Sequence, residues 1–432
     1  MMRKSIYLAS LARSSSLASY ISKIRVRYLE TQAASSRNSD RDEEYADNID
    51  WNNLGFGLMP TDYMYVIKCG RDDEFKQGQL SRYGNIELSP SAGVLNYGQV
   101  VKINSIIRTF ISCNARLQLL QGLFEGTKAY RREDGCLFLF RPQQNAIRMQ
   151  IGAERMCMPS PSTQLFVDAV KQTVLANRRW VILFYKHFGL YALRIFFLHI
   201  YKLSVELGQI PPPGKGSLYV RPILFGSGPI LGLAPASEYT FLVFASPVGN
   251  YFKEGTAPLN LYVEDEFHRS ARGGAGGVKS ITNYAPVLKS LSKARNRGFS
   301  DVLYLDSVNK RYIEEVSSCN VFILKGNVLS TPATNGTILK GITRNSIIEI
   351  APDLGYQVEE RPIPVEELLD ADEVFCTGTA VGVAPVGSIT SKGNRIEYKM
   401  SNQLVCFQLY SRLMGIQRGS IQDKRGWIVE ID

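Results

Sequence analysis

The sequence predicts a mixed α/β (α+β) protein with two domains, and three observations lead to this prediction. The chain has 432 residues, which is enough to build two domains with large hydrophobic cores. Segments with the patterns of strands and of helices occur together in both halves of the chain. Between two strand-like segments lies GSGPILGLAPASE (226–238), whose Gly, Pro and Ala content is typical of a connection between domains.

The N-terminal region has the composition of a targeting peptide. Residues 1–39 are rich in Ser and hold seven Lys/Arg against one acid, Glu30, and no clean apolar run follows the first charges. This composition predicts a transit peptide rather than a secretory signal. Its arginines favour mitochondria, with the chloroplast as the alternative, while a disordered tail is the plainer interpretation. Residues 40–52 are polar and are predicted to form a linker.

The first domain is predicted to span residues 53–228. Strands are expected at DYMYVIK (62–68) and at LFLFRP, around Leu137, because both are rich in apolar and aromatic residues. A helix is expected near 146–149. SLYVRPILF (217–225) predicts the last strand of this domain.

The second domain is predicted to span residues 239–432, after an interdomain loop at 229–238. Its predicted elements, in chain order, are strands at 239–249 and 259–265, a helix at 283–298, a strand at 301–306, a hairpin at 320–332 that turns at Lys325-Gly326-Asn327, a helix at 341–355 and a final strand at 373–383.

Charge and cysteine content exclude two classes of function. Of the net charge of +10, residues 1–39 contribute +6 and two segments described below contribute +3 and +2, so the rest of the chain is near neutral. A near-neutral body lacks the basic face that nucleic acids require. The seven cysteines are scattered without a CxxC pair, so neither a zinc site nor a disulfide framework is expected.

Two segments, 100–121 and 181–209, differ from their surroundings. The second holds seven Phe/Tyr in 29 residues and two of the three histidines of the chain. Both begin with Val and end with Gln, as in-frame introns would, because GT begins a Val codon and CAG encodes Gln. We therefore hypothesise that both are retained introns, with genuine helical insertions as the alternative. No membrane span is expected in 181–209, since basic residues leave no run of about 18 uncharged apolar residues.

The clearest chemical signal is Lys279 in ARGGAGGVKSITNYAP (271–286). It follows a run of Gly and Ala, on backbone that can approach a ligand closely. A lysine that forms a Schiff base needs such access and a lowered pKa, obtained from desolvation or a neighbouring cation. By pattern alone, a solvated lysine beside a flexible loop is the plainer interpretation.

With 100–121 and 181–209 left out, the sequence from Trp51 to Asp432 resembles the plant branched-chain aminotransferases, which are fold-type-IV pyridoxal-phosphate enzymes. The motifs that carry the resemblance stand in family order: FGLMPTDYMY, YGQ and then GLFEGTKAYRREDG, FRPQQNAIRM, PPPGKGSLYVRP, GGVKSITNYAPVLK, YIEEVSSCNVF, GITRNSI and CTGTAVGVAPVG. The resemblance implies a small N-terminal domain, a large cofactor-binding domain, an active site between them and a homodimer.

The resemblance also implies contacts to pyridoxal 5′-phosphate. Lys279 is expected to form the Schiff base and to move a proton between substrate and cofactor. Glu315 is expected to pair with the pyridine nitrogen and keep it protonated, which makes the ring an electron sink. Glu314, beside it in a strand, faces the other way and is expected to be solvated. Tyr284 is expected to hydrogen-bond the phenolate oxygen.

The cofactor phosphate needs cations and backbone N–H groups. Arg148 matches the phosphate arginine of the family, and Ile342 and Thr343 begin a predicted helix whose first amides would point at an anion. Thr379 in CTGTA adds a hydroxyl and an amide. Without the resemblance, Thr343 would be most simply a helix cap and CTGTA a plain turn.

For the substrate, the resemblance implies an apolar pocket formed by Phe56, Tyr97 and Tyr219. One methylene in such a pocket is worth only about 1–3 kcal/mol, so discrimination among Leu, Ile and Val is expected to be poor.

Carboxylate-binding groups are expected beside this pocket. Arg221, on the same strand face as Tyr219, matches the arginine for the second carboxylate of glutamate. Ser318 and Ala380 match the contacts to the α-carboxylate.

The predicted function is reversible transamination between branched-chain L-amino acids and 2-oxoglutarate. D-amino-acid transaminase and aminodeoxychorismate lyase are alternatives of the same fold type, although LYVRP and GVAPVG favour the L-branched-chain group. A catalytically impaired isoform is a further alternative, because segment 100–121 begins shortly after Tyr97, in an expected active-site strand. We therefore expect the full chain to fold like its family but to have weak or no activity.

Overall fold

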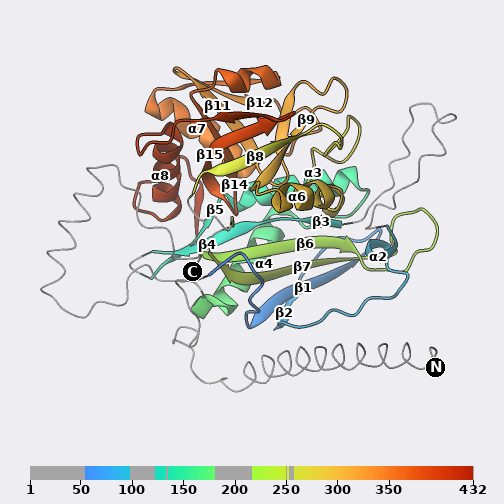
Figure 1. Cartoon of the computed structure of the whole chain (residues 1–432). Helices are drawn as coiled ribbons and strands as arrows, with labels where there is room; N and C mark the ends of the chain where they lie inside the picture. Colours follow the sequence, from blue (N-terminus) through green and yellow to red (C-terminus); the bar gives the residue numbers. More distant parts are fainter. Residues whose placement is uncertain are drawn as a thin grey trace, which may run out of the picture. The chain divides into compact units, whose positions relative to one another are not determined.

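The computed structural model of the chain describes residues 54–97, 122–132, 135–180, 217–249, 251–252 and 257–431. The predicted transit peptide, the predicted linker and both predicted insertions lie outside these residues. The described residues belong to one compact unit, 49–432. They form two β-sheets, each with helices packed against it (Figure 1).

The first sheet is antiparallel in all its described pairs and is drawn mainly in blue to green in Figure 1. Its strand order is β17-β5-β4-β6-β7-β1-β2, and β3 pairs with β6. The strands are β1 (Tyr63–Gly70), β2 (Gln79–Arg82), β3 (Gly122–Phe124), β4 (Thr127–Arg131), β5 (Leu137–Phe140), β6 (Ser217–Gly226), β7 (Glu238–Val248) and β17 (Ile428–Ile431).

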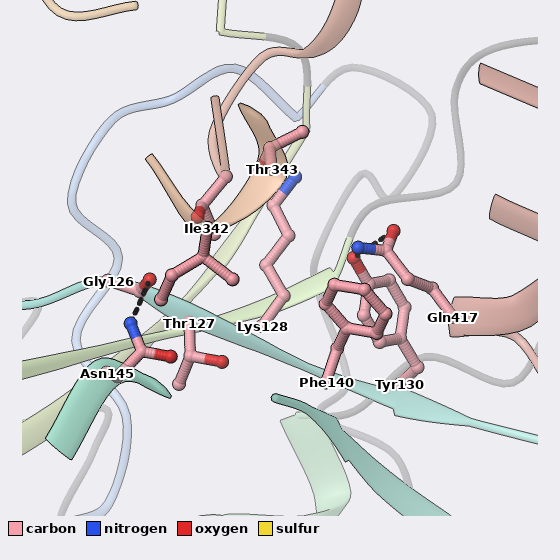
Figure 2. A pocket seen from close by; sticks show the side chains of 10 residues that line it. Gly126, Thr127, Lys128, Tyr130, Phe140, Asn145, Ile342, Thr343 and Gln417 are labelled. Carbon is pink, nitrogen blue, oxygen red and sulfur yellow. Dashed lines mark hydrogen bonds between the residues drawn. The ribbon is translucent and has the colours of Figure 1, made fainter. Parts of the chain in front are cut away.

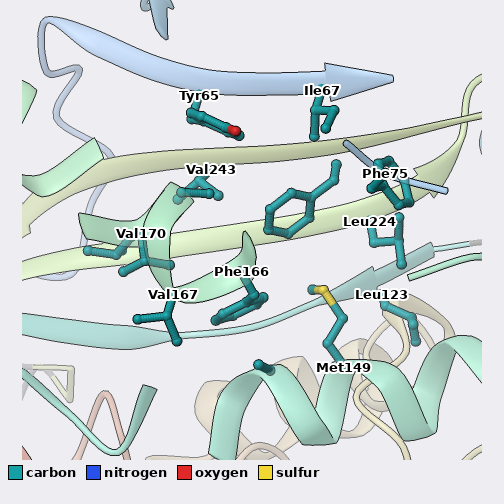
Figure 3. Close-up of a cluster of buried hydrophobic side chains, with 14 of the residues drawn as sticks. Tyr65, Ile67, Phe75, Leu123, Met149, Phe166, Val167, Val170, Leu224 and Val243 are labelled. Carbon is teal, nitrogen blue, oxygen red and sulfur yellow. The ribbon is translucent and has the colours of Figure 1, made fainter. Parts of the chain in front are cut away.

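Two helices pack together and cover the first sheet. The helical elements in this half are α2 (Gly93–Tyr97), α3 (Pro142–Arg155), α4 (Thr163–Ala176) and η1 (Arg178–Trp180). The Ser162 side chain accepts a hydrogen bond from the amide of Leu165 and so caps α4. Figure 3 shows Phe166 and Val170 of α4 facing Tyr65 and Val243 of the sheet, in a core whose members are almost fully buried.

The second sheet is mixed and is drawn in yellow to red in Figure 1. Its strand order is β10-β9-β8-β15-β14-β11-β12-β13, and β16 pairs with β15. The strands are β8 (Leu259–Glu264), β9 (Asp301–Leu305), β10 (Ile313–Val316), β11 (Asn320–Lys325), β12 (Val328–Pro332), β13 (Gln357–Arg361), β14 (Glu373–Gly378), β15 (Gly382–Ser391) and β16 (Asn394–Glu397). Strand β8 runs parallel to β9 and β15, and β12 runs parallel to β13.

The helices of the second half pack on this sheet and join it to the first. They are η2 (Ile281–Asn283), α6 (Val287–Asn296), α7 (Ile342–Ile350), η3 (Ala351–Leu354), η4 (Val365–Leu369) and α8 (Val405–Gln417). Helix α8 packs against α7 and β15, whereas β17, which follows it, pairs with β5 of the first sheet. None of the helices in the described residues is long and apolar enough to cross a membrane.

Most of the predicted elements are confirmed. The strands predicted in the first half correspond to β1, β5 and β6, and the helix expected near 146–149 is part of α3. In the second half, β7, β8, β9, α6 and α7 lie where they were predicted. The predicted hairpin is formed by β11 and β12: Lys325 pairs with Val328, and Gly326 takes the positive φ of 56° that the turn requires.

The predicted position of the interdomain loop is wrong. Residues 227–237 join β6 to β7, which are neighbours in the first sheet. The chain crosses to the second sheet between Val248 and Leu259, one strand later than the predicted loop at 229–238. The Gly, Pro and Ala content of this segment therefore belongs to a loop between two antiparallel strands, and the division into two domains remains a prediction.

Two further predictions need correction. The single strand predicted at 373–383 is two antiparallel strands, β14 and β15, because the backbone turns at 379–381, and it is not the last strand of the chain. The strand expected around Tyr97 is also wrong, since Tyr97 ends the short helix α2.

Candidate active site

A cavity of about 450 Å³ lies between the two sheets. Strands β3 and β6 line it from the first sheet, and β10, β11, β14 and the first residues of α7 line it from the other side. Twelve of the thirteen residues that the sequence predicted for the site line this cavity, namely Phe56, Arg148, Tyr219, Arg221, Lys279, Tyr284, Glu315, Ser318, Ile342, Thr343, Thr379 and Ala380. The thirteenth is Tyr97, whose side chain lies outside what the structure describes.

Lys279 is half-buried and faces an aromatic wall. Its Nζ donates to the hydroxyl of Tyr284 at 3.1 Å and lies 4.6 Å from the ring centre of Phe124. The rings of Phe124 and Tyr284 meet edge to face, 4.9 Å apart. The amide of Phe124 donates to the carbonyl of Lys279 at 3.2 Å, so β3 fixes the backbone that carries the amine.

The glycines before Lys279 are required for packing against the protein's own backbone. A Cβ at Gly276 would lie 2.4 Å from the carbonyl oxygen of Thr337, and one at Gly277 would lie 3.0 Å from that of Gly336. The hydroxyl of Ser270 donates to the same Thr337 carbonyl at 2.7 Å. The sequence therefore indicated a close approach correctly, but the partner is segment 336–337 rather than a ligand.

Glu315 is a buried carboxylate with three described partners. Its Oε1 lies 2.8 Å from Nη1 of Arg269 and accepts from the amide of Leu339 at 2.8 Å. Its Oε2 accepts from Nδ2 of Asn320 at 3.3 Å. Burial raises the pKa of Glu315 to about 7, although Arg269, the Leu339 amide and Lys279 lower it. A group with this pKa changes its charge near neutral pH.

The expectation that Glu314 is solvated is wrong. Its exposed fraction is 5%, because the whole of β10 is buried. Burial raises the pKa of Glu314, while hydrogen bonds and the charge of Arg269 oppose the rise. Strand alternation turns Glu314 away from Glu315, as predicted, but that face of the strand is covered too.

Arg148 is held by a second buried acid. Its Nε and Nη2 donate to the two oxygens of Glu125 at 2.8 and 2.7 Å, and its Nη1 donates to the carbonyl of Lys340 at 3.0 Å. Asn145 donates to the same Glu125 carboxylate at 2.8 Å. Burial lowers the pKa of Arg148, but Glu125 outweighs it, so the net shift is upward. A guanidinium has five N–H groups, so two remain for an anion in the cavity.

The N-terminus of α7 faces the same cavity as Arg148. The helix begins after Gly341, no side chain of the described residues caps its first amides, and Ile342 and Thr343 line the cavity. A Cβ at Gly341 would lie 2.1 Å from Oδ1 of Asn320, so this position needs glycine. Uncapped amides at a helix start are a common binding site for phosphate groups.

The turn at Thr379 and Ala380 is tied to the first sheet by Lys128. Nζ of Lys128 donates to the carbonyl of Ala380 at 3.2 Å. Figure 2 shows the Lys128 side chain extending from β4 toward Thr343, in a small polar space beside the main cavity. Burial, and then the charge of Arg418, lowers the pKa of Lys128 to about 8.

Predicted substrate residues belong to an aromatic group that lines the same cavity. The ring of Phe56 lies edge-on to Tyr219 at 5.1 Å and to Tyr251 at 5.0 Å. The hydroxyls of Tyr251 and Ser318 are 3.0 Å apart. A Cβ at Gly126 would lie within bonding distance of the Tyr219 hydroxyl, so this glycine makes room for it.

Arg221 is the cation beside this aromatic group. Its Nη2 donates to the hydroxyl of Tyr219 at 3.2 Å, and its Cζ lies 4.6 Å from the ring centre of Phe124. Its Nε is buried without a hydrogen-bond partner among the described residues. Within that part of the chain, Arg221 also forms no ion pair with a carboxylate.

Sequence reasoning missed three groups of the site. Arg269 stands in an ordinary polar segment, and only the need of buried Glu315 for a cation would have pointed to it. Glu125 lies within the quoted motif GLFEGTKAYR, but nothing in its spacing indicated that it holds Arg148. Tyr251 follows PVG at the end of β7, where an isolated tyrosine carries no signal.

Comparisons with known proteins identify the family of the chain. Residues 122–389 match the family described as amino-transferase class IV. The chain is 58% identical over 423 residues to the chloroplastic branched-chain-amino-acid aminotransferase 2 of Arabidopsis thaliana, covering 95% of this chain and 96% of that protein. It is 59% identical over 385 residues to the mitochondrial branched-chain amino acid aminotransferase 1 of Humulus lupulus, covering 89% and 85%.

Solved structures share the fold. The branched-chain amino acid aminotransferase of Escherichia coli superposes with a TM-score of 0.62 at 23% identity, over 86% of this chain and 99% of that one. The branched-chain amino acid aminotransferase of Thermobaculum terrenum, in its PLP-form, superposes with a TM-score of 0.62 at 19% identity, over 86% and 99%. By its family match and its identity to the plant relatives, the chain belongs to the class IV aminotransferases and, within them, to the plant branched-chain aminotransferases.

Proposed function

We propose that this chain catalyses the reversible transfer of the amino group of Leu, Ile or Val to 2-oxoglutarate, with pyridoxal 5′-phosphate bound at Lys279. One observation carries the proposal: a single cavity holds an accessible lysine, a buried carboxylate, an arginine beside an uncapped helix start, and an aromatic wall with its own arginine. The chain also shares more than half of its residues with enzymes named for this activity.

The groups around the cavity fit pyridoxal 5′-phosphate. The two free N–H groups of Arg148 and the first amides of α7 suit its phosphate. Glu315 suits its ring nitrogen, and the Tyr284 hydroxyl, beside the lysine amine, suits its phenolate oxygen. When bound, this cofactor supplies an aldehyde that accepts the amino group and a ring that withdraws electrons.

Lys279 has two tasks in this proposal. Its amine would hold the cofactor covalently, and as a free amine it would move the proton at the substrate's α-carbon. The Lys279 amine lies over the ring of Phe124 and donates to the hydroxyl of Tyr284. These two rings, packed edge to face, therefore limit the positions that the amine can take.

The substrate residues divide between an apolar side chain and carboxylates. Phe56, Tyr219 and Tyr251 provide an apolar surface of the kind that accepts aliphatic side chains. The hydroxyl of Ser318, which lines the cavity, suits an α-carboxylate. Arg221, without a carboxylate partner in the described residues, suits the second carboxylate of glutamate.

An assay of leucine with 2-oxoglutarate tests the proposal. Either the full chain or, if that is inactive, the chain without segments 100–121 and 181–209 should form glutamate. Lys279→Ala should lower turnover by about 10³-fold or more, because it removes both the covalent link and the proton carrier. Substantial turnover in that variant would remove Lys279 from its proposed role.

Two finer proposals concern compartment and assembly. Residues 1–39 are proposed to direct the chain to mitochondria, with the chloroplast as the alternative, since the relatives named above include both kinds. A fluorescent fusion of this segment would distinguish the two compartments.

A homodimer is proposed from the family resemblance, and light scattering of the purified protein tests it.

A further inference from the structure

Glu315 lines the cavity and is part of the proposed function. Arg269 pairs with Glu315 but is not among the residues that line the cavity. The pair joins two side chains that are almost fully enclosed, with exposed fractions of 1% for Arg269 and 2% for Glu315. Nε of Arg269 is buried without a hydrogen-bond partner among the described residues. A buried cation with unused donors costs stability, so its retention calls for an explanation.

Segment 337–339 contacts residues that follow Arg269 in the chain and also the carboxylate of Glu315. Ser270, the next residue, donates to the carbonyl of Thr337 at 2.7 Å, and Gly276 packs against that same carbonyl. Two residues further along, the amide of Leu339 donates to Glu315 at 2.8 Å. Segment 269–279 therefore carries both the cation of Glu315 and the lysine of the cavity.

We propose that Arg269 is a positioning residue of the active site, whose buried guanidinium favours the ionised form of Glu315 and holds its carboxylate toward the cavity that contains Lys279. The inference deepens the proposed function and rests on it for the meaning of a charged Glu315. The charges that act on Glu315 are those of Arg269, Glu314 and Lys279, and the Leu339 amide and the Asn320 side chain donate hydrogen bonds to it. Arg269 makes the closest ionic contact among them, at 2.8 Å.

The electrostatic balance at Glu315 gives the direction of the effect. Burial and Glu314 favour the protonated acid, whereas Arg269 favours the carboxylate. Removing the guanidinium leaves a buried acid beside a second acid, so Glu315 should hold its proton to higher pH. An opposite charge at this distance shifts a carboxyl pKa by about 1–3 units.

The first test is the pH profile of turnover in the assembled enzyme. Arg269→Met should move the acid limb upward by about 1–3 pH units, with activity recovering at high pH. Arg269→Gln carries the same prediction should the methionine variant fold poorly, and Arg269→Lys should stay near the wild-type limb. An unmoved limb in an active Arg269→Met or Arg269→Gln protein would overturn the proposal.

Arg344 offers a matched control, because its side chain is also 1% exposed and pairs with Glu360 at 2.7 Å outside the cavity. Arg344→Met should lower stability without moving the acid limb. A shift of the limb in this variant as large as that in Arg269→Met would show that loss of any buried arginine produces it, and would likewise overturn the proposal.

The second test measures stability and does not depend on activity. Because the pKa of folded Glu315 lies above that of an unfolded glutamate, stability falls as pH rises between these two values and levels off above the folded one. In Arg269→Met the fall should continue to higher pH. A double-mutant cycle with Glu315→Gln, unfolded in urea on the full chain without added cofactor, should show coupling that grows from about pH 6 to about pH 8.5.

These outcomes separate two failures. If the wild-type protein lacks transaminase activity but shows pH-dependent coupling between positions 269 and 315, the proposed function is wrong and the electrostatic role of Arg269 toward Glu315 stands. An active enzyme whose coupling is absent or independent of pH would remove the role of Arg269 alone.

Discussion

Two regions of the cavity wall are built differently. In the region proposed to hold the cofactor (the cofactor end), formed by Lys279, Glu315, Arg148 and the start of α7, the buried acids Glu315 and Glu125 each have an arginine and at least one further hydrogen-bond donor. At the substrate end, formed by Phe56, Tyr219, Tyr251 and Arg221, the contacts are ring edges and one arginine without a carboxylate partner in the described residues.

This difference follows from what each end would bind. A permanently bound, highly charged cofactor requires polar groups that are already in place, since rearranging them would consume binding energy. A substrate end that must accept both an aliphatic side chain and a second carboxylate benefits from rings and a cation that is not committed to a partner.

Removing the two atypical segments addresses the substrate end. Deleting 100–121 and 181–209 should raise leucine turnover by about 100-fold, because a misplacement of ~1 Å at a reacting group costs that much. The first segment begins shortly after Tyr97, so deletion of 100–121 alone should give the larger share of the gain. Equal turnover with and without the segments would contradict this prediction. Sequencing cDNA across residues 180–211 tests their origin, since a transcript that retains 181–209 excludes an error of the gene model.

Neutralising Arg148 tests the cofactor end. Arg148→Met alone would leave Glu125 buried without its cation. The double variant Arg148→Met/Glu125→Gln is therefore compared with the single variant Glu125→Gln. Loss of two charged hydrogen bonds, worth about 1.5–3 kcal/mol each, should weaken pyridoxal-phosphate binding by at least ~100-fold. Equilibrium dialysis measures this affinity, and an unchanged value would place the phosphate elsewhere.

Arg221→Met should affect kcat/KM for glutamate and for leucine differently. It should lower kcat/KM for glutamate by about 10–100-fold, the worth of one charged hydrogen bond. The value for leucine, which has no second carboxylate, should change less than about threefold and serves as the internal control. Equal losses for both amino acids would mean that Arg221 maintains the aromatic wall rather than binding a carboxylate.

The smallest effect is expected among the branched-chain substrates themselves. Leu, Ile and Val differ by one methylene or by its position. Their kcat/KM values should lie within about 10-fold of one another, the low end of the range of about 10–200-fold that one methylene is worth. Measuring the three under the same conditions checks this. A preference of about 10⁴-fold would require a shaped pocket that rings in edge contact do not provide.

The sequence predicted individual elements and site residues better than it predicted connections. Glycines 276 and 277 indicated a close backbone approach, and the structure contains one. The position of the crossing between the sheets could not be read from 226–238, because Gly and Pro are favoured in any tight loop, including one between neighbouring strands. Glu314 was misjudged for a related reason: alternation in a strand tells which way a side chain points but not what covers that face.

The partners of the predicted site residues were the least visible part. Arg269 and Glu125 matter because burial makes an unpaired ion costly, and burial depends on contacts between residues far apart in the chain. The motif around each residue carries no signal of that pairing. Lys128 is a similar case, since its bond to Ala380 joins positions that are 252 residues apart.

Borohydride reduction of the purified protein with pyridoxal 5′-phosphate, followed by peptide mapping, tests the central claim most directly. A stable cofactor adduct is expected on the peptide that contains Lys279 and on no other. An adduct on a different lysine, or the absence of any adduct in protein that transaminates leucine, would contradict it.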